Sequence, residues 1–378
     1  MAITAQRIGS LSQVEAAQWN ALAGTDCPFL RHEFLATLEE TGCVGPGTGW
    51  DPSHLLLHDG AQLIGAVPAY LKSHSWGEFV FDFGWAQAYA RHGLNYYPKL
   101  LAAVPFSPTT GARLLVHPGA APATADLLIA ALQAATRELD LSSAHVLFMQ
   151  DSDRQRLEAA GWMLRRDCQF HWHNQGYADF EGYLATFTAE KRKKTRRERR
   201  RCSEAGIRFE TLYGSTITRS ELDVVYAFHT STFVRHGHEP YLTREFFTKI
   251  AARLGDSLMI KLAVQADRPV AAAVFFWYEA ALYGRYWGAL EDFHSLHFET
   301  CYHQGIEFCI ERGIARFEPG TQGEHKISRG FEPSLTWSAH YLADTRFRAA
   351  IGDYLEREAP AVEAYLAEAG RHTPFRRA

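Results

Sequence analysis

The segment Gly313–Phe331, GIARFEPGTQGEHKISRGF, combines a predicted strand, a glycine-rich turn and several chemically active side chains. The strand covers Ile314–Glu318 and ends at Pro319-Gly320, and another glycine follows at Gly323. Proline and glycine at the end of a strand make a sharp turn and let the backbone approach a ligand closely. A carboxylate, an amide, an imidazole and an ammonium group stand within nine residues there. This density favours a functional site, with a solvated loop as the alternative.

The composition is that of a soluble globular protein, with 378 residues, 47% of them hydrophobic and 22% charged. This length is sufficient for two domains with cores of their own. We expect no transmembrane segment and no signal peptide, because no apolar run is long enough to span a bilayer and the N-terminal residues lack a basic start followed by an apolar stretch. The six cysteines are scattered without Cys-x-x-Cys pairs, which predicts free thiols in a reducing cytoplasm and no metal site.

Positive charge is concentrated in the run Lys191–Arg201, KRKKTRRERRR, which holds nine basic residues and one acidic residue. The whole chain has 39 basic and 43 acidic residues, so the chain outside this run has 30 and 42, a net charge of −12. On a helix the run would place positive charge on every face, with no apolar stripe after Phe187. It is either a solvated helix held by its neighbours or a clamp for the phosphates of a nucleotide, a CoA-like carrier or tRNA. The candidate anion-binding residues are Lys191, Arg192, Lys194, Arg196 and Arg197.

The first half of the chain predicts strands and helices in mixed order. Strands are expected at 4–8, on both sides of the Asp59-Gly60 hairpin turn, at 113–117 and at 145–149. Helices are expected at 12–22, opened by a Ser12/Glu15 capping box, and at 33–41, 124–139 and 153–160. The aromatic segment 78–100 either recognises a nonpolar or sugar-like ligand or packs as a strand and loop against the core. Its candidate substrate-binding residues are Trp85, Tyr89, His92, Tyr96 and Lys99.

The second half repeats this order of elements without evident sequence identity between the halves. Strands are expected at 207–213, 258–265, 270–278, 282–288, 314–318 and 335–342, and helices at 180–205, 218–234, from 243, at 299–312 and at 345–367. The helix at 218–234 is opened by a Thr218/Glu221 capping box. Along 282–288, the side chains of Tyr283, Arg285 and Trp287 are expected on one face and that of Tyr286 on the other. His297 and Glu299 flank a predicted helix start, where they line a pocket edge or, for Glu299, simply cap the first turn.

The segment Tyr286–Phe331, YWGALEDFHSLHFETCYHQGIEFCIERGIARFEPGTQGEHKISRGF, resembles the C-terminal part of the Fem family, tandem GNAT-fold peptidyltransferases that add amino acids to peptidoglycan precursors. With FDFGW at Phe81–Trp85 and the string Glu318–Lys326, the chain is more similar still to the FemAB-like predicted N-acyltransferases. The resemblance, together with the repeated order of elements, implies a mixed α/β fold of two tandem GNAT-like domains. We expect these domains at residues 1–165 and 166–378, with a substrate cleft between them.

The chain departs from the Fem pattern in three respects. The long coiled-coil arm of several Fem proteins has no counterpart, and Glu318 stands where Fem proteins more often have Asp. The pyrophosphate-cradling loop of ordinary acetyltransferases is not clearly present in either half. Peptidoglycan specificity and the use of acetyl-CoA are therefore not supported by a motif.

Acyl transfer to an amine needs a group that accepts the amine proton, groups that polarise the acyl carbonyl and a proton for the leaving group. Glu318 is the candidate proton acceptor, with an ion pair to a nearby Lys or Arg as the alternative. Resemblance to the Fem lysine makes Lys326 a candidate for holding a phosphate or the developing oxyanion. Gln322 is a candidate donor to the carbonyl, and His325 is either a proton relay or a structural hydrogen bonder. Further substrate-binding candidates in this half are Arg285, Trp287, His297, Glu299 and Arg329.

These observations predict a cytoplasmic N-acyltransferase that moves an activated acyl group to an amine of a small molecule or peptide by direct attack. The donor substrate is acyl-CoA or aminoacyl-tRNA, and we expect no tightly bound cofactor. Two alternatives stay open. One is an aminoacyl-tRNA-dependent peptidyltransferase acting on a cell-wall-type precursor, with tRNA contacting residues 191–201. The other is a non-catalytic GNAT-like scaffold that binds RNA or an anionic surface through the same run.

Overall fold

The chain divides into two units in a computed structural model that describes residues 3–291, 293–321 and 323–376. Unit 1 comprises Met1–Cys168 and Leu335–Tyr365, and unit 2 comprises Gln169–Ser334 and Leu366–Ala378. The division falls within three elements, β9 (Met163–His173), β15 (Glu332–Leu342) and α12 (Thr345–Arg371). Each unit is therefore built from two separate parts of the chain, whereas the sequence predicted two contiguous domains that meet after residue 165.

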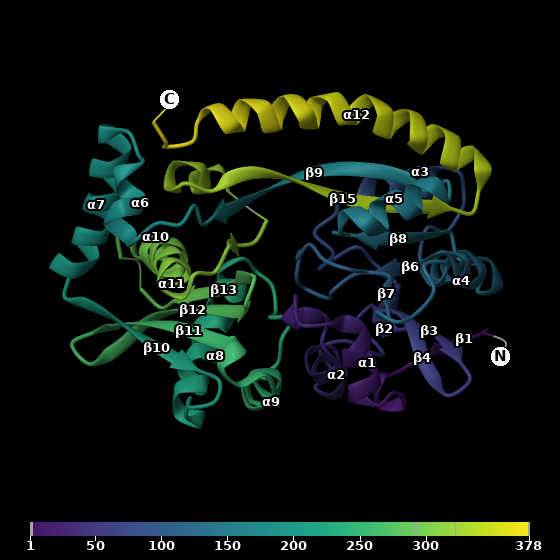
Figure 1. Cartoon of the computed structure of the whole chain (residues 1–378), viewed down its shortest axis with the longest axis horizontal. Coiled ribbons are helices and arrows are strands. Elements are labelled where there is room, and N and C mark those ends of the chain that lie inside the picture. The colour runs from purple at the N-terminus through teal and green to yellow at the C-terminus, as the bar shows by residue number, and fades with distance from the viewer. Residues whose placement is uncertain (1–2, 292, 322, 377–378) are drawn as a thin grey trace. The chain divides into compact units, whose positions relative to one another are not determined.

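Unit 1 contains an antiparallel sheet in the order β1-β3-β4-β7 and a second ladder in the order β15-β8-β6-β5-β2 (Figure 1). In the second ladder β6 and β8 run parallel, and the neighbouring pairs are antiparallel. The strands are β1 (Ile3–Ile8), β2 (Trp50–Pro52), β3 (His54–Asp59), β4 (Gln62–Val67), β5 (Ala69–Lys72), β6 (Lys99–Ala102), β7 (Leu115–Val116) and β8 (Ser143–Leu147). The helices are α1 (Ala16–Ala23), α2 (His32–Glu40), α3 (Phe83–Arg91), α4 (Thr124–Glu138) and α5 (Asp151–Ala159).

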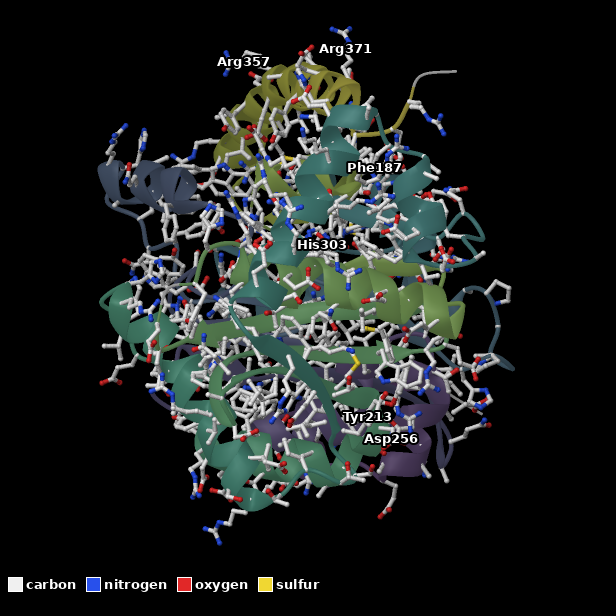
Figure 2. The ribbon with its side chains drawn as sticks, turned by 90° about the vertical axis from the view of Figure 1, so that its left-hand side faces the viewer. Phe187, Tyr213, Asp256, His303, Arg357 and Arg371 are labelled. Carbon is white, nitrogen blue, oxygen red and sulfur yellow. The ribbon has the colours of Figure 1, made fainter. Side chains whose placement is uncertain are left out.

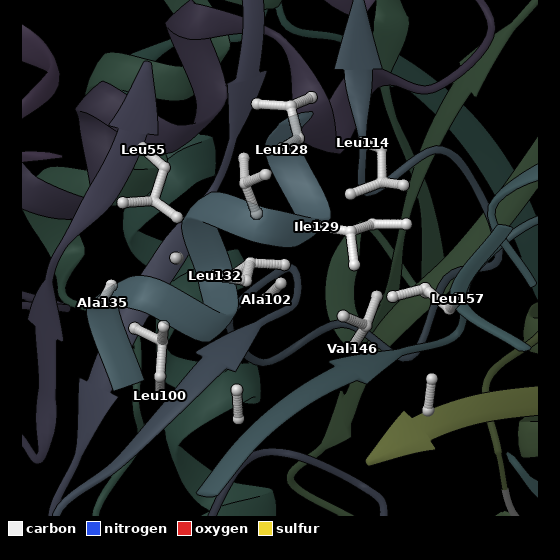
Figure 3. Packing of buried hydrophobic residues seen from close by; sticks show 14 of the residues in the cluster. Leu55, Leu100, Ala102, Leu114, Leu128, Ile129, Leu132, Ala135, Val146 and Leu157 are labelled. Carbon is white, nitrogen blue, oxygen red and sulfur yellow. The ribbon is translucent and has the colours of Figure 1, made fainter. Parts of the chain in front are cut away.

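The apolar core of unit 1 lies between helix α4 and the strands beside it (Figure 3). Leu128, Ile129 and Leu132 of α4 are at most 2% exposed and cluster with Leu100 of β6 and Val146 of β8. Full burial of each such side chain contributes about 1.5–3 kcal/mol to the free energy of folding. This packing fixes strand β6, whose first residue is the buried Lys99.

Unit 2 is built on strands in the order β10-β11-β12-β13-β14-β9, in which only the β13–β14 pair is parallel among the described residues (Figure 1). The strands are β10 (Ile207–Tyr213), β11 (Leu258–Gln265), β12 (Arg268–Tyr278), β13 (Ala281–Ala289) and β14 (Arg316–Glu318). The α-helices are α6 (Phe180–Ala185), α7 (Ala189–Glu204), α8 (Arg219–Arg235), α9 (Arg244–Leu254), α10 (Leu296–Phe298) and α11 (Gln304–Arg312). A π-helical turn η4 (Glu299–His303) joins α10 to α11, and a 3-10 helix η5 (Glu324–Arg329) follows β14.

Most predicted elements are confirmed, including the Thr218/Glu221 capping box that opens α8. The capping box predicted at Ser12 is wrong, because Ser10 accepts the hydrogen bond there and α1 begins only at Ala16. The helix predicted from Glu299 begins earlier, in α10, and contains the π-helical turn.

Two further elements, helix α3 and strand β9, differ from the expectations. The aromatic segment, for which a strand and loop packed against the core was one of two alternatives, forms helix α3, whose buried residues are Trp85 and Tyr89. Strand β9 was not predicted, because MLRRDCQFHWH lacks a regular alternation of apolar and polar residues. Its second half is buried on both faces, as expected for a strand inside a sheet rather than at an edge.

Candidate functional site

The strands β13 and β14 part immediately after Glu318, and this divergence is the centre of the candidate site. The two strands are paired only from Ala281 to Tyr283, opposite Arg316 to Glu318, while β13 continues to Ala289. The chain leaves β14 through Pro319-Gly320, where Gly320 has a positive φ of 92°. The predicted turn at this point is therefore present, and it lets the chain turn back so that Lys326 reaches the carbonyl oxygen of Gly320.

A β-bulge at Arg285 directs this side chain to the divergence. Val274 of β12 is opposite Tyr286 and Phe275 is opposite Gly284, so that Arg285 is an extra residue in β13. Its side chain is 2% exposed and donates hydrogen bonds to the carbonyl oxygens of Gly284 at 2.9 Å and of Glu318 at 3.1 Å. Bulges of this kind change the direction of a side chain and are frequent beside active sites.

The bulge also corrects the predicted faces of β13. With one extra residue at Arg285, Tyr283 and Tyr286 share a face, and Trp287 lies on the other. The ring of Tyr286 contacts His229 of α8, whereas that of Trp287 contacts His297 at 5.3 Å between centroids. The simple alternation predicted for Tyr283, Arg285 and Trp287 is therefore wrong.

Lys326 is buried on η5, with 2% of its surface exposed. Its ammonium group donates a hydrogen bond to the carbonyl oxygen of Gly320 at 2.6 Å. Burial lowers the pKa of Lys326 to about 7, the nearby charge of Arg285 lowers it further, and the neighbouring Cys301 opposes this shift. At neutral pH both forms of the amine are therefore populated, which suits a group that donates or returns a proton.

Glu318 is buried at the end of β14 and forms ion pairs with two arginines. Its carboxylate lies 3.0 Å from Nε of Arg316 and 3.9 Å from Nη2 of Arg285. The ion pair that the sequence left open as an alternative is thus present. A role as proton acceptor stays a prediction, and Gln322 lies outside the described residues.

His325 and His297 belong to one aromatic cluster with Phe298 and Tyr302. The Nε2 atom of His325 lies 2.9 Å from the hydroxyl of Tyr302, and its ring is 6.0 Å from that of His297. Burial, with the charges of Lys326 and Arg329, lowers the pKa of His325, and burial lowers the pKa of His297 to about 4. At neutral pH His297 is therefore uncharged and acts as a hydrogen bonder or packing group.

Glu299 and Arg329 each pair with helix α7. The carboxylate of Glu299 lies 3.2 Å from Nε of Arg199, and Arg329 makes a two-point ion pair with Glu198, with Nη2 to Oε1 at 2.6 Å and Nε to Oε2 at 3.1 Å. His303 of the π-helical turn, labelled in Figure 2, places its Nε2 3.2 Å from the same Glu198 carboxylate. Glu198 was not predicted as a site residue, although it is the single acidic residue in the basic run.

The basic run forms most of helix α7, which has two distinct faces. Its buried residues are Thr195, Glu198 and Cys202, so the helix has a buried stripe, in which only Cys202, just beyond the run, is apolar. Of the predicted anion-binding residues, Lys194, Arg196 and Arg197 are exposed, and Lys191 and Arg192 are half-buried. Arg196 pairs with Glu181. Among the residues that the structure describes, Lys194 and Arg197 have no acidic partner.

In unit 1 most of the predicted substrate-binding residues are core residues. Trp85, Tyr89 and Tyr96 are 6%, 3% and 2% exposed and cluster with Phe347 and other apolar residues of α12. Their rings therefore offer little surface to a ligand, as the packing alternative predicted. His92 differs in being exposed, and it borders a cavity of about 350 Å³ lined also by Leu94, Arg346, Phe347 and Ala350.

Lys99 is fully buried in a network of charged and polar groups, most of which were not among the predicted site residues. Its ammonium group donates to Ser75 and Glu78, each at 2.8 Å, and pairs with Asp82. The hydroxyl of Tyr96 donates to Asp82 at 2.6 Å. The spacing of Ser75, Glu78 and Asp82, which is i, i+3 and i+7, was the available signal, but the three residues lie in a loop and a helix N-terminus rather than on one helix face.

Electrostatics in this network differ from residue to residue. Burial alone would lower the pKa of Lys99, but the charges of Glu78 and Asp82 outweigh it and raise the pKa. Burial would raise the pKa of Asp82, but Lys99 lowers it to about 2, whereas burial raises the pKa of Glu78 to about 7. Lys72, which lies beside Glu78, has its pKa lowered by burial to about 7.

Other site types find no support in the described parts of the chain. No group of three or more His, Cys, Asp and Glu residues among them is placed to hold a metal ion. None of the described helices is long and apolar enough to cross a membrane.

A cavity of about 770 Å³, larger than the one beside His92, lies in unit 2 near the starts of α8 and α9. It is lined in part by Gly214, Arg219 and Arg244.

The sequence of the chain matches a known protein family, and its fold is similar to that of several solved structures. The FemAB-like family, described as peptidoglycan biosynthesis/recognition, matches residues 10–377, while no curated protein sequence matches the chain. The crystal structure of FemX is similar with a TM-score of 0.55 at 10% identity, covering 92% of this chain and 100% of that chain. The structure of L-PGS from Bacillus licheniformis gives 0.52 at 11% identity, covering 85% and 93%. A conserved protein of unknown function from Bacteroides thetaiotaomicron gives 0.51 at 11% identity, covering 86% and 97%.

At such low identity the structural likeness shows the fold alone, and it confirms the predicted mixed α/β fold of two tandem GNAT-like domains. The family match extends over nearly the whole chain, including the β13–β14 divergence and the segment with Lys326. The chain therefore belongs to the FemAB-like family.

Proposed function

We propose that this FemAB-like protein transfers an activated acyl or aminoacyl group to an amine, and that the transfer takes place where β13 and β14 part. Membership in the family supports the transferase class. The observation that carries the site is the presence of two buried cationic side chains, Arg285 and Lys326, at the point where the two strands separate. Buried cationic N–H donors are suited to stabilising the oxyanion of acyl transfer or the phosphates of a carrier.

The chemistry follows direct attack without a covalent enzyme intermediate. The amine nitrogen of the acceptor bonds to the acyl carbonyl carbon, whose oxygen becomes an oxyanion near Arg285 and Lys326. The Glu318 carboxylate accepts the proton that the amine loses. Collapse of the intermediate breaks the bond to the thioester sulfur or the ester oxygen, and protonated Lys326 supplies the proton to that leaving group. Solvent then restores the two side chains to their starting protonation states.

A second candidate, aminoacyl-tRNA as the donor, is favoured by the outer face of α7. Lys193, Lys194 and Arg197 are exposed there and have no acidic partner among the described residues. Phosphate groups bind such clusters in a salt-dependent manner without sequence selection. A carrier with a long phosphate backbone fits this face better than a small thioester does.

Thermal unfolding with added ligands tests these proposals. The probes are acetyl-CoA, longer acyl-CoAs, free CoA and bulk aminoacyl-tRNA, each added to the wild type and to Lys326→Met. A ligand at a hundred times its dissociation constant stabilises the native state by about 2.7 kcal/mol. Stabilisation by a CoA species supports the thioester donor, and stabilisation by aminoacyl-tRNA alone, abolished by ribonuclease, supports the peptidyltransferase. Stabilisation by none of them, together with salt-sensitive RNA binding and no transfer, contradicts the proposal in favour of a non-catalytic scaffold.

A further inference from the structure

The acidic residue inside the basic run is placed where it can act on the candidate site. Glu198 stands among nine basic residues in Lys191–Arg201, yet its side chain is only 8% exposed. Arg197 before it is exposed and Arg199 after it is half-buried. An acidic group needed only to moderate the charge of a surface helix would be expected in solvent rather than on the buried face.

The partners of Glu198 lie on the segment that carries Lys326 and on the π-helical turn before it. Its carboxylate binds Arg329 through two hydrogen bonds, at 2.6 and 3.1 Å, and lies 3.2 Å from Nε2 of His303. Burial would raise the pKa of Glu198, but the hydrogen bond to His303 and the charge of Arg329 outweigh it and lower the pKa. Glu198 is therefore ionised, and its charge compensates the buried guanidinium of Arg329.

Arg329 in turn holds both ends of η5. Its Nη1 donates to the carbonyl oxygen of His325 at 2.6 Å, and its guanidinium lies 3.4 Å above the ring of Phe298. Its own carbonyl oxygen accepts a hydrogen bond from the hydroxyl of Tyr183 at 2.7 Å. Lys326 lies between His325 and Arg329 in sequence. The contacts of these two residues therefore restrict the position of Lys326.

Helix α7 has other attachments besides Glu198. Arg199 binds Glu307 of α11 at 2.6 and 3.3 Å and Glu299 at 3.2 Å, and Arg196 pairs with Glu181 of α6. The pair Arg199–Glu307 is also joined at two points, through Nη1 and Nη2 rather than Nε and Nη2, but its residues belong to α7 and α11 and not to η5. The ion pair of Glu198 therefore differs from the other ion pairs of α7 in binding Arg329, which belongs to η5.

We propose that Glu198 is a positioning residue, which fixes the segment with Lys326 against helix α7 through Arg329 and so keeps Lys326 at the β13–β14 divergence. This inference rests on the proposed function of Lys326 for its catalytic meaning, although the coupling itself is independent of any activity. Glu198 touches no reacting atom in this arrangement and acts only through Arg329.

Competitive acetylation of the whole protein with acetic anhydride tests the coupling, because it reports the titration of each lysine by mass spectrometry. In the wild type the labelling midpoint of Lys326 is expected at about 7. In Glu198→Gln the segment loosens and water reaches the amine, so the midpoint rises by roughly one pH unit or more toward that of an ordinary lysine. Glu198→Asp is expected to restore much of the shift, and Arg329→Lys serves as a second variant if Glu198→Gln does not fold.

The matched control is Glu307→Gln, which breaks the other two-point ion pair of α7. It is expected to leave the midpoint of Lys326 unchanged while lowering thermal stability by less than Glu198→Gln does, because the side chain of Glu307 is 32% exposed and that of Glu198 only 8%. An unchanged midpoint in Glu198→Gln, or in Arg329→Lys if Glu198→Gln does not fold, would overturn the proposal and leave Glu198 a purely structural residue. The proposed function fails separately, if Lys326→Met retains full transfer activity whatever the labelling shows.

Discussion

Two buried lysines, Lys99 in unit 1 and Lys326 in unit 2, have opposite electrostatic environments. Lys99 is surrounded by Glu78, Asp82 and Ser75, and these carboxylates raise its pKa. Lys326 donates a hydrogen bond to one carbonyl oxygen and has no carboxylate among the causes of its shift, so burial, with the nearby cation of Arg285, lowers its pKa to about 7. The difference shows that burial alone does not make a lysine reactive. Its neighbours decide between a structural cation and an amine that titrates near neutral pH.

The largest expected effect is that of removing the charge of Lys99. Lys99→Met leaves the carboxylates of Glu78 and Asp82 buried without their cation, and breaking such a pair costs about 3–5 kcal/mol of stability. Urea unfolding followed by fluorescence measures this loss as a lower midpoint at an unchanged slope. A variant as stable as the wild type would show that the network is hydrated and that the comparison of the two lysines is mistaken.

Smaller losses of stability, which differ from each other, are expected when the charge of either carboxylate around Lys99 is removed. Asp82, with a pKa of about 2, is ionised at all physiological pH values and accepts hydrogen bonds from Ser75 and Tyr96. Asp82→Asn is therefore expected to cost about 2 kcal/mol at pH 7. Glu78, with a pKa raised to about 7, is already mostly neutral in mild acid, so Glu78→Gln is expected to cost less than about 1 kcal/mol there.

The sign of the pH dependence distinguishes these carboxylates further. The folded-state pKa of Asp82 is depressed, so its contribution is present above the unfolded pKa and is lost as the pH falls toward 2. The folded-state pKa of Glu78 is raised, so its contribution is complete in acid and is lost as the pH rises through about 7. Unfolding free energies measured against pH for the two variants check both trends, and equal profiles would contradict the assignment.

Lys326→Met is expected to change stability in the opposite direction from Lys99→Met. The native state holds the amine of Lys326 with a depressed pKa, so its burial costs stability at neutral and acid pH, and the cost fades as the pH rises toward the unfolded pKa. We expect Lys326→Met to stabilise the protein by about 1 kcal/mol at pH 7, with the gain shrinking in alkaline solution. Thermal melts at two pH values measure this, and a destabilised variant would indicate a structural role.

Much of the fold followed from local patterns in the sequence. The hairpin around Asp59-Gly60, the Thr218/Glu221 capping box and the turn after Glu318 were all predicted, because each depends on residues close in sequence. The bulge at Arg285 was not predicted, because its register depends on the partner strand β12. Strand β9 was missed for a similar reason, since its burial comes from neighbours distant in sequence.

The candidate site was predictable in its residue types and less so in its contacts. The glycine-rich segment indicated Glu318, His325 and Lys326, but the ion pair of Glu198 with Arg329 joins residues 131 positions apart. No local pattern reports such a pair. The network around Lys99 likewise joins a loop, a helix start and a strand, which only the fold brings together.

The smallest effect on stability is expected on the outer face of α7. Lys194→Glu and Arg197→Glu change exposed side chains without an acidic partner in the described structure, so stability is expected to stay within about 0.5 kcal/mol of the wild type. Binding of RNA, if this face holds it, should weaken sharply and lose part of its salt dependence. Arg200→Glu, which disrupts the i, i+4 pair with Glu204, is a nearby control for general charge effects.

The rate of acyl transfer by Lys326→Met tests the central claim most directly. The control is Lys261→Met, because Lys261 is another largely buried lysine of unit 2 with a lowered pKa, held by Thr211 rather than near the β13–β14 divergence. With whichever donor stabilises the protein, Lys326→Met is predicted to remain folded and lose about 100-fold or more in kcat/KM, while Lys261→Met keeps wild-type transfer. A folded Lys326→Met enzyme with wild-type kcat/KM would contradict the account.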